Sequence, residues 1–424
     1  MLTAETFAAS IAVTTVSSPS GAISPASASV QRGARAVFTV TPSSGATLVG
    51  VSGCGGTLEG NRYTTQPISA ACKVVATFAR PQSRIQGFNS PWGMTVLPDG
   101  RLLITEKVGN LVIVDAARTR IEKRVSVPLP IGVMGQGGLL DVALDPDFSS
   151  DPWVYLTFSE RGSGEEDGLL GSAVARVRFD GENFTGWQVI YRQVPKASRR
   201  VHFGSRLVFR ADKTLFVTFG DRGGGAPAQD LAATIGKVVR IQRDGSIPTD
   251  NPAIPGARRE IWSLGHRNIQ GAAIRPGTND LWAHEHGPQG GDELNRVQAA
   301  GNYGWPVVSY GCNYGDPVGE TCRIGGGVHA PKFIEPVAFW VPTSVAPSGL
   351  VFYSGSRFAP WAGNILFGTL AGSALWRVEL EGDRERRREP LFTELRERIR
   401  DVELAPDGAL YLLTDSGKLF EVRD

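Results

Sequence analysis

Residues 93–115 read GMTVLPDGRLLITEKVGNLVIVD, and this stretch contains the unit from which most of the chain is built. Its apolar residues fall into three short segments, as is typical of β-strands. A Pro-Asp-Gly triplet separates the first two segments and a Gly-Asn pair separates the next two, and both are turn signals. The stretch therefore predicts three strands joined by tight turns.

Five further copies of this unit follow, at residues 139–160, 204–223, 269–287, 347–380 and 399–422. They recur roughly every 45–60 residues, a spacing typical of β-propeller blades. One sheet cannot bury both of its faces alone, whereas sheets packed around a common axis can. We therefore predict an all-β chain in which residues 84–424 form a six-bladed β-propeller. The alternative, a large β-sandwich, does not account for a repeat of this period.

Residues 1–80 lack the repeat. Short alternating segments rich in Val and Thr, such as ARAVFTVTPS and CKVVATFA, are separated by Gly, Ser and Pro, which predicts a small β-sandwich-like domain. No histidine and no carboxylate cluster in it could serve catalysis. It resembles the β-repeat modules of secreted bacterial proteins, so we expect a spacer or adhesive role. The predicted boundary is RPQS at residues 80–83.

The overall composition argues against several classes of function. The net charge of the 424-residue chain is only +2, which gives no basis for a nucleic-acid partner held by phosphate contacts. No apolar run approaches the roughly 20 residues of a membrane span. The N-terminal MLTAETFAAS lacks the basic and apolar regions of a signal peptide. Only residues 230–236 and 383–396 are expected to be helical, and only briefly.

The four cysteines fall into two local pairs, Cys54 with Cys72 and Cys312 with Cys322. An even number in close pairs indicates two disulfides and an oxidising compartment, so we expect a periplasmic or secreted protein. The alternative is four free thiols in a cytosolic protein. Neither pair has the spacing of a zinc or redox site.

The stretch from Leu264 to Pro306 is the most unusual part of the chain. It contains three of the five histidines, His266, His284 and His286, together with an acidic pair and eight glycines. Clustered glycines mark turns or close approach of the backbone to a ligand. The stretch therefore indicates a site built on loops above a rigid sheet.

In a propeller, residues at the ends of repeated strands converge at the mouth of the central channel. Candidates chosen by this rule are Gln136, His202, Asp221, Arg267, Asn268, Gln270, His286, Gly287, Pro288, Ser344, Arg398 and Arg400. Several guanidinium groups and an imidazole would suit an anionic, planar ligand, because arginine pairs with carboxylates through two parallel hydrogen bonds.

Nine motifs in order resemble one known family. They are GQGGLLD, HFGSRL, GDRG, GKVVRI, LGHRNIQG, EHGPQGGDELN, GNYGWP, VAPSG and RIRDV, between residues 135 and 402. They resemble the soluble PQQ-dependent glucose dehydrogenase and aldose sugar dehydrogenase family, also called the glucose/sorbosone dehydrogenases. The resemblance spans about residues 84–424. It implies a six-bladed propeller that binds calcium and pyrroloquinoline quinone (PQQ), a tricarboxylate ortho-quinone.

The resemblance also implies the reaction and its residues. His202 matches the base that takes the proton of the anomeric hydroxyl of an aldose, so that the sugar becomes a lactone. Asp221 matches the carboxylate that orients this imidazole. Arg267 matches the arginine beside the quinone oxygens, where its charge would stabilise the reduced cofactor. The electrons would pass to an external acceptor.

The remaining implied residues hold the cofactor and calcium. Gln136, Asn268, Arg398 and Arg400 match cofactor contacts, and Gln270 and Ser344 are expected beside them. The main-chain carbonyls of Gly287 and Pro288 match ligands of the calcium ion at the cofactor. Glu293 and the carbonyl of Tyr303 match a second, structural calcium site. Oxygen ligands of this kind suit calcium.

Three positions depart from the family's glucose enzymes. Val201 replaces an Asp, Ala371 replaces a Lys, and Thr343-Ser344-Val345 replaces a segment that includes a Trp. Arg206 or Lys237 could supply the missing cation. These departures weaken a glucose-specific interpretation and are compatible with a broader aldose specificity.

Other interpretations stay open. The chain could be a non-catalytic propeller that has lost the cofactor, or a hydrolase that uses calcium alone, although such sites are acidic rather than arginine-rich. His202 could be structural, and His284 with His286 could bind a metal. The RERRRE run at residues 384–389 is expected to be a solvated surface.

Overall fold

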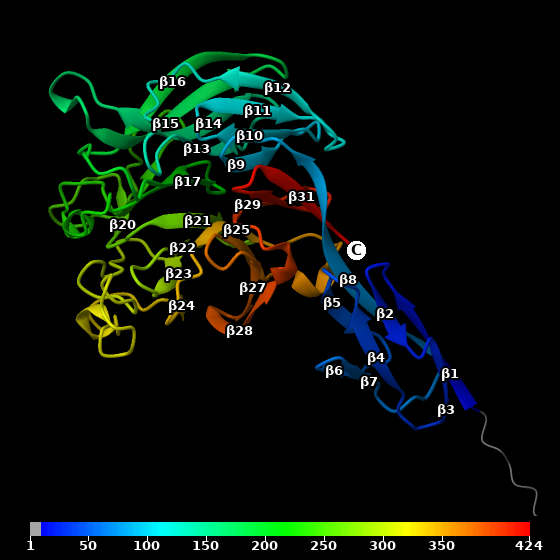
Figure 1. Cartoon of the computed structure of the whole chain (residues 1–424). Coiled ribbons are helices and arrows are strands. Elements are labelled where there is room, and N and C mark those ends of the chain that lie inside the picture. The colour runs from blue at the N-terminus through cyan, green and yellow to red at the C-terminus, as the bar shows by residue number, and fades with distance from the viewer. Residues whose placement is uncertain (1–9) are drawn as a thin grey trace, which may run out of the picture.

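A computed structural model describes residues 10–424, which form 31 strands and five short 3-10 helices but no α-helix (Figure 1). Five sheets each consist of four antiparallel strands that follow one another along the chain. Their strands are β9 (Pro91–Val96), β10 (Leu102–Glu106), β11 (Asn110–Val114) and β12 (Ile121–Ser126); β13 (Leu139–Leu144), β14 (Trp153–Arg161), β15 (Leu170–Phe179) and β16 (Phe184–Arg192); β17 (Gly204–Phe209), β18 (Leu215–Phe219), β19 (Lys237–Ile241) and β20 (Ile261–Leu264); β21 (Ile269–Ile274), β22 (Leu281–Glu285), β23 (Asp292–Val297) and β24 (Ala338–Trp340); and β25 (Pro347–Phe352), β26 (Ile365–Thr369), β27 (Leu375–Glu381) and β28 (Arg384–Leu391).

The last part of the chain forms β29 (Ile399–Leu404), β30 (Leu410–Thr414) and β31 (Lys418–Arg423), and β8 (Cys72–Gln86) adds to β31 from the other end of the sequence. The first strands of successive sheets lie in contact, from β9 through β13, β17, β21 and β25 to β29, and β29 returns to β9. The sheets therefore surround an axis as a closed β-propeller, in which β8 and β31 join the two ends of the chain.

The turns of the repeat explain its glycines. Between β9 and β10 the Leu97 N–H bonds the Arg101 carbonyl at 2.8 Å, and Gly100 closes the turn at φ +87°. That conformation is open to glycine and strained for most other residues. Between neighbouring sheets, apolar side chains such as Tyr155 of β14 and Leu207 of β17 form continuous buried clusters.

In each propeller sheet the pairing between the first and second strands shifts register near the point where the first strand begins. In β21 the unpaired residue is Gln270, and in β29 it is Arg400. A β-bulge of this kind redirects a side chain and is common beside functional sites. The bulges therefore place polar side chains around the axis, where regular pairing would not.

Residues 10–79 form two small sheets that extend away from the propeller (Figure 1). One contains β1 (Ser10–Ser17), β3 (Ser27–Gln31), β5 (Thr47–Ser52) and the first half of β8; the other contains β2 (Gly21–Ser24), β4 (Val37–Pro42), β7 (Arg62–Thr64) and β6 (Thr57–Glu59). Val13, Phe38, Tyr63 and Phe78 are among the residues of their shared core. The predicted boundary at residues 80–83 lies inside β8, which runs unbroken from these sheets into the propeller.

The prediction of short helices at residues 230–236 and 383–396 is wrong. Residues 230–236 form turns after the 3-10 helix η2 (Ala226–Gln229), and 383–396 contain strand β28 and η5 (Thr393–Leu395). The arginine-rich run pairs with β27 across the sheet, and Arg386 bonds Glu379 at 2.8 Å. Cross-strand pairing overrides the weak local preference of such a run for helix. The other 3-10 helices are η1 (Gly164–Glu166), η3 (Ile324–Gly326) and η4 (Ala359–Trp361).

Both expected cysteine pairs are confirmed as disulfides, Cys54–Cys72 in the N-terminal sheets and Cys312–Cys322 in the loop between β23 and β24. Within residues 10–424 no helix has the length and apolar character needed to cross a membrane.

Candidate active site

A cavity of about 230 Å³ lies at the axis, where the first strands begin and the second strands end. Its walls come from all parts of the propeller sequence, as the convergence of strand ends requires. Six residues chosen from the sequence line it, namely Gln136, Asn268, Gln270, His286, Arg398 and Arg400; the other lining residues are Trp92, Lys107, Leu140, Phe203, Gly204, Ala346 and Leu370.

His202 and Asp221 form a hydrogen-bonded pair at the edge of this cavity. His202 Nδ1 lies 2.7 Å from Asp221 Oδ1. Phe203 and Gly204, the two residues after His202, line the cavity wall. Because Nδ1 is committed to the carboxylate, Nε2 is the ring nitrogen left to accept a proton.

Asp221 is held in its ionised form by its surroundings. Its side chain is only 1% exposed, and burial alone would raise its pKa. Hydrogen bonds from His202, from the Gly223 N–H at 2.7 Å and from Trp305 Nε1 at 2.7 Å outweigh burial, so the pKa of Asp221 lies below its usual value. A fixed, charged carboxylate of this kind holds the imidazole in one orientation.

The backbone of His202 is held in an unusual conformation. Its φ is +53°, and its N–H donates to Gln136 Oε1 at 2.7 Å. A left-handed backbone is uncommon outside glycine and costs free energy, so it is typical of functional positions. The chain after His202 then turns into β17, whose first residue, Gly204, donates to Asn268 Oδ1 at 3.2 Å.

Asn268 and Gln270 are tied to each other and to this wall. Gln270 Nε2 lies 3.3 Å from Asn268 Oδ1 and 3.3 Å from the Gly204 carbonyl. Both side chains are nearly buried, so their amide groups form a fixed polar surface at the cavity. Such a surface can hold a polar, planar ligand in one orientation.

Arg267 is buried beside the cavity rather than among its lining residues. Its guanidinium donates to the His286 carbonyl at 3.0 Å and to Tyr314 Oη at 3.3 Å. It also lies over the Trp305 ring, 5.2 Å from the centroid, and its backbone N–H bonds Glu285. No carboxylate within residues 10–424 forms an ion pair with the Arg267 guanidinium. Its charge therefore remains available to an anion.

Three cations line the cavity, Lys107, Arg398 and Arg400. Asp415 accepts from Arg400 Nε at 2.7 Å and from Arg398 Nε at 2.9 Å. Lys107 Nζ donates to the Gly135 carbonyl at 3.2 Å, and burial, with Arg400 nearby, lowers the pKa of Lys107. One carboxylate cannot neutralise three cations, so the cavity favours an anionic ligand.

Sequence reasoning missed Lys107 and Asp415, although the repeat contains the signal. Lys107 directly follows β10 and Asp415 directly follows β30, as His286 follows β22 and Leu370 follows β26. All four positions are equivalent in the repeated unit. The rule that selected Asp221 and His286 would have found both residues if it had been applied to the first and sixth copies.

His286 is half-buried, and its Nε2 lies 2.7 Å from the Pro347 carbonyl. Burial is the largest cause that lowers the pKa of His286 to about 3, and Arg267 and Arg400 act in the same direction. The ring is therefore neutral at physiological pH. His284 is fully buried, and within residues 10–424 no group of three or more His, Cys, Asp or Glu side chains is placed to hold a metal ion together.

Ser344 lies outside the cavity lining. Its hydroxyl donates to Asp292 Oδ2 at 2.7 Å, and the same carboxylate accepts from the backbone of Gly287, Val345 and Ala346. Asp292 therefore holds the loop that follows β22 against the loop that precedes β25. Ser344 serves this junction, and only Ala346 of its loop reaches the cavity.

A second, much smaller cavity of about 10 Å³ lies beyond Arg267. Gly287, Glu293 and Tyr303 line it together with Glu285, whereas Pro288 is not among its lining residues. Burial raises the pKa of Glu293 despite contact with His329, and Glu285 adds to the rise. Two buried carboxylates at a space the size of a single ion form a site that a cation would stabilise.

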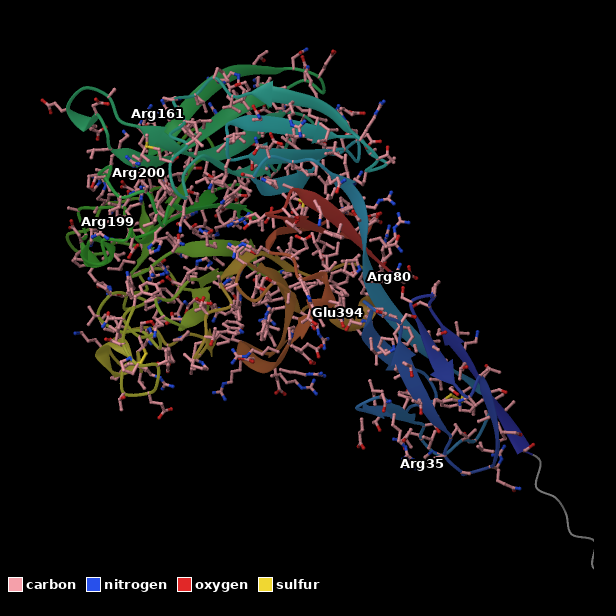
Figure 2. The ribbon with its side chains drawn as sticks, viewed as in Figure 1. Arg35, Arg80, Arg161, Arg199, Arg200 and Glu394 are labelled. Atoms are coloured by element: carbon pink, nitrogen blue, oxygen red, sulfur yellow. A yellow bond between two sulfur atoms is a disulfide. The ribbon has the colours of Figure 1, made fainter. Side chains whose placement is uncertain are left out.

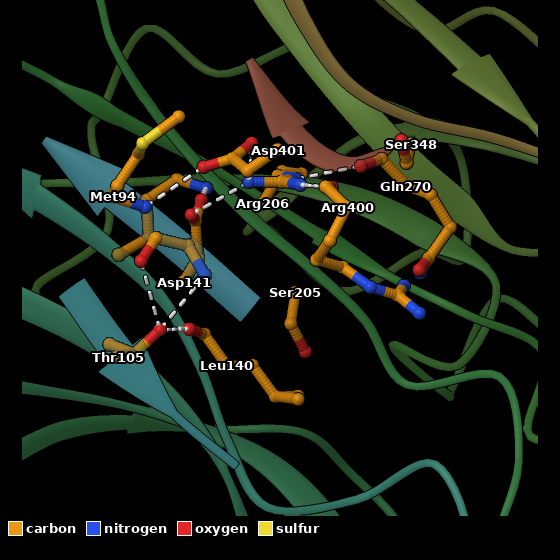
Figure 3. Close-up of polar contacts among 12 residues, drawn as sticks. Met94, Thr105, Leu140, Asp141, Ser205, Arg206, Gln270, Ser348, Arg400 and Asp401 are labelled. Carbon is orange, nitrogen blue, oxygen red and sulfur yellow. Dashed lines mark hydrogen bonds and ion pairs between the residues drawn. The ribbon is translucent and has the colours of Figure 1, made fainter. Parts of the chain in front are cut away.

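The two candidates for a replacement cation are both occupied elsewhere. Arg206 lies on the axis, paired with Asp141 at 3.0 Å and Asp401 at 2.9 Å, with its Nε bonded to the Gln270 carbonyl (Figure 3). Lys237 is buried and donates to the Pro227 and Ile235 carbonyls. Neither side chain lines the cavity, so Lys107 is the lysine that faces it.

Comparisons with known proteins agree with this geometry. The sequence model of the family described as Glucose / Sorbosone dehydrogenase matches residues 88–421. The chain is 40% identical over 343 residues to the aldose sugar dehydrogenase YliI of Escherichia coli, covering 78% of this chain and 89% of that protein.

Two solved structures are similar throughout the propeller. The apo-form of the soluble aldose sugar dehydrogenase of Escherichia coli has a TM-score of 0.75 at 37% identity, covering 81% of this chain and 99% of that one. The PQQ-bound aldose sugar dehydrogenase of Streptomyces coelicolor has a TM-score of 0.68 at 30% identity, covering 81% and 97%. The chain therefore belongs to the glucose/sorbosone dehydrogenase family.

Proposed function

We propose that this protein is a PQQ-dependent aldose sugar dehydrogenase, which oxidises the C1 hydroxyl of aldoses to lactones and passes the electrons to an external acceptor. The observation that carries this proposal is the His202–Asp221 pair, at 2.7 Å, beside a cavity lined by three cations. Two relatives support it: the similar protein of Escherichia coli is named an aldose sugar dehydrogenase, and the similar structure from Streptomyces coelicolor is the PQQ-bound form of such an enzyme.

In this proposal His202 is the base of the reaction. Nε2 would take the proton of the C1 hydroxyl, while the C1 hydrogen leaves with two electrons and the carbonyl of the lactone forms. Asp221 stabilises the imidazolium that results, because its charge lies in direct hydrogen-bond contact with Nδ1. Bound PQQ supplies the two-electron oxidant for this step.

The residues present fit PQQ, because its three carboxylates would meet Lys107, Arg398 and Arg400. Asn268, Gln270 and Gln136 offer amide groups in the same cavity. Arg267, which has no acidic partner, would stabilise negative charge on the quinone oxygens. Ser344 would act indirectly, through Asp292 and the loop that includes Ala346.

We also propose calcium at two places. At the cofactor, the carbonyls of Gly287 and Pro288 would be its protein ligands. In the smaller cavity, Glu293 and the carbonyl of Tyr303 would hold a second ion, with Glu285 close by. Within residues 10–424 these two buried carboxylates form no ion pair with a lysine or an arginine and contact only histidines, His266 at Glu285 and His329 at Glu293, which supports this second site.

The wider assignment has three further parts. We propose that the propeller has six blades, the sixth completed by β8, and that residues 1–80 are an accessory domain remote from the chemistry. The two disulfides support a periplasmic or secreted location. Val201, Ala371 and the altered segment at Ser344 support a specificity broader than glucose.

Ala371 and Val201 also motivate a second candidate, a propeller that has lost the cofactor and serves recognition. Titration with PQQ in the presence of calcium, followed by absorbance, separates the two. Saturable binding, with dye reduction by a panel of aldoses, supports the dehydrogenase. Absence of PQQ binding would favour the recognition module.

Substitution of the cavity cations sharpens this test. R398A and R400A remove charges that PQQ would meet, so we expect about tenfold weaker PQQ binding for each. R384A, on the outer strand β28, is the matched control and should bind PQQ like the wild type. Unchanged binding in both cavity variants would show that the carboxylates lie elsewhere.

A further inference from the structure

Three exposed arginines, Arg161, Arg199 and Arg200, lie close to the mouth of the cavity but outside it. Figure 2 shows them together on the side of the molecule opposite to the N-terminal sheets, where Arg35 lies. Among residues 10–424, no carboxylate lies within ion-pair distance of these three guanidinium groups. We call Arg161, Arg199 and Arg200 the arginine rim.

Backbone contacts fix the rim to the cavity wall. The Arg200 carbonyl accepts from the Gln136 N–H at 2.9 Å, and Gln136 itself lines the cavity and bonds His202. The Arg161 N–H donates to the Pro130 carbonyl at 2.9 Å, at the base of the same loop. The rim therefore stands directly beside the proposed base, at a fixed position.

Apolar side chains are exposed within the rim. Val133 is 44% exposed and Met134 is 40% exposed, and both belong to the loop that includes Gln136. Arginine and methionine are enriched in protein interfaces, and exposed apolar groups beside charges are typical of docking surfaces. A surface that served only solubility would not need Val133 and Met134 at this place.

The acidic residues nearby do not neutralise the rim. Glu160 is paired with Arg192 at 2.9 Å and with Lys196 at 3.2 Å, and Glu166 is paired with Lys196 at 2.7 Å. Glu165 and Asp167 are exposed on the neighbouring turn, and neither forms an ion pair with any residue between 10 and 424. The three rim charges are thus unpaired, whereas the arginines of β28 at Arg386 and Arg387 have Glu379 and Glu389 as partners.

A neutral aldose gives no reason for unpaired cations outside the cavity. The reaction, however, must dispose of electrons. Oxidation of one aldose to a lactone releases two electrons and two protons, so two one-electron acceptors are each reduced once and the protons pass to solvent. An acceptor too large to enter the cavity must dock at its mouth.

We propose that the arginine rim is the docking surface for an acidic redox protein that accepts these electrons. This inference rests on the proposed function. Opposite charge on the partner would steer it to the mouth, while Val133 and Met134 would form the apolar centre of the contact. Electrostatic steering makes the rate of transfer fall as ionic strength rises.

The test uses one haem protein in two charge forms, a basic cytochrome c and the same cytochrome with its lysines succinylated. We expect the PQQ- and calcium-loaded wild type to reduce the acidic form faster, with an advantage that shrinks at high salt. R161E/R199E/R200E should lose at least about tenfold in kcat/KM for the acidic form and gain for the basic one. R384E/R386E/R387E, which changes the net charge equally on β28, should behave like the wild type.

Small probes separate the alternatives. Ferricyanide, an anion that is not a protein, should respond less to the rim substitution than the acidic cytochrome, and a neutral phenazine dye should not respond. Equal cytochrome rates in the wild type and the rim variant would overturn the proposal. A raised KM for uronic acids with every acceptor would overturn it too, because the rim would then bind sugar. Absence of dye reduction by the wild type would instead refute the proposed function.

Discussion

At the residue scale, the candidate chemistry depends on one imidazole and on the carboxylate beneath it. Asp221 has no freedom to move, because His202, Gly223 and Trp305 all bond it. Its task in our proposal is electrostatic, since an amide of the same shape could keep some of these contacts but not the charge. That distinction can be measured.

D221N should retain PQQ binding and lose about a hundredfold or more in kcat, because an amide does not stabilise the imidazolium and favours the wrong tautomer. Dye reduction under saturating aldose, together with PQQ titration, checks both points. Equal kcat in D221N and wild type would remove Asp221 from the mechanism.

Lys237 offers an independent check on the electrostatics of the fold. Burial lowers the pKa of Lys237 to about 7, whereas an unfolded lysine titrates near 10. The depressed pKa means that the folded state binds this proton less well than the unfolded state, so the cost of Lys237 to stability grows as pH falls from about 10 to about 7 and is constant below.

Across this window the free energy of unfolding of K237M, relative to wild type, should therefore rise as the pH is lowered. Denaturant unfolding at several pH values between 7 and 10 measures it. K213M, at an exposed lysine, serves as the control and should give a difference that does not depend on pH. If the difference in unfolding free energy between K237M and wild type did not depend on pH, this would contradict the lowered pKa of Lys237.

At the scale of elements, the equivalent positions after the second strands explain how the cavity is built. Lys107, His286, Leu370 and Asp415 come from four sheets and meet because each directly follows a strand in the same place of the repeat. The sequence pattern was sufficient to predict this convergence. It could not predict the β-bulges that turn the side chains of Gln270 and Arg400 into the cavity, because a bulge depends on pairing with a partner strand.

Strand β8 was also beyond prediction from local pattern. Its second half pairs with β31, from Arg80–Arg423 to Gln86–Lys418, so the two partners lie at opposite ends of the sequence. The predicted boundary, RPQS at residues 80–83, includes Pro81 and lies in this half of the strand. In an edge position such a residue is tolerated within a strand.

Deletion of residues 1–80 tests whether the N-terminal sheets matter to catalysis. Residues 81–86 would remain to pair with β31, so the ring should close and kcat should be unchanged. Val49 and Ala79, however, pack against Trp361 and Phe358, and their loss should lower the unfolding midpoint by roughly 2–6 °C. A thermal melt at fixed scan rate and dye reduction measure both. A large fall in kcat would contradict the separation of the two parts.

At the scale of the whole molecule, the propeller has two unlike faces. The long loops and the arginine rim lie on one side, and the N-terminal sheets extend from the other (Figures 1 and 2). The fold class followed from the repeat, and the positions of His202, Asp221 and Arg267 followed from motifs. Lys107, Asp292 and His329 did not, because their roles arise from contacts between loops of different sheets.

The arrangement on the axis belongs to the same scale. Arg206, between Asp141 and Asp401, joins β13, β17 and β29 below the cavity (Figure 3). R206M would leave two buried carboxylates without their cation, and we expect a loss of stability of about 3–5 kcal/mol. Denaturant unfolding checks this value, and a loss below about 1 kcal/mol would show that the ring does not depend on this junction.

The central claim is that His202 takes the proton of an aldose at a cavity that holds PQQ. The most direct measurement is dye reduction by H202A, loaded with PQQ and calcium, beside an absorbance titration of the same variant with PQQ. We predict PQQ affinity within about threefold of wild type and a fall in kcat of about a thousandfold or more. Turnover close to that of the wild type, with PQQ bound, would contradict the claim.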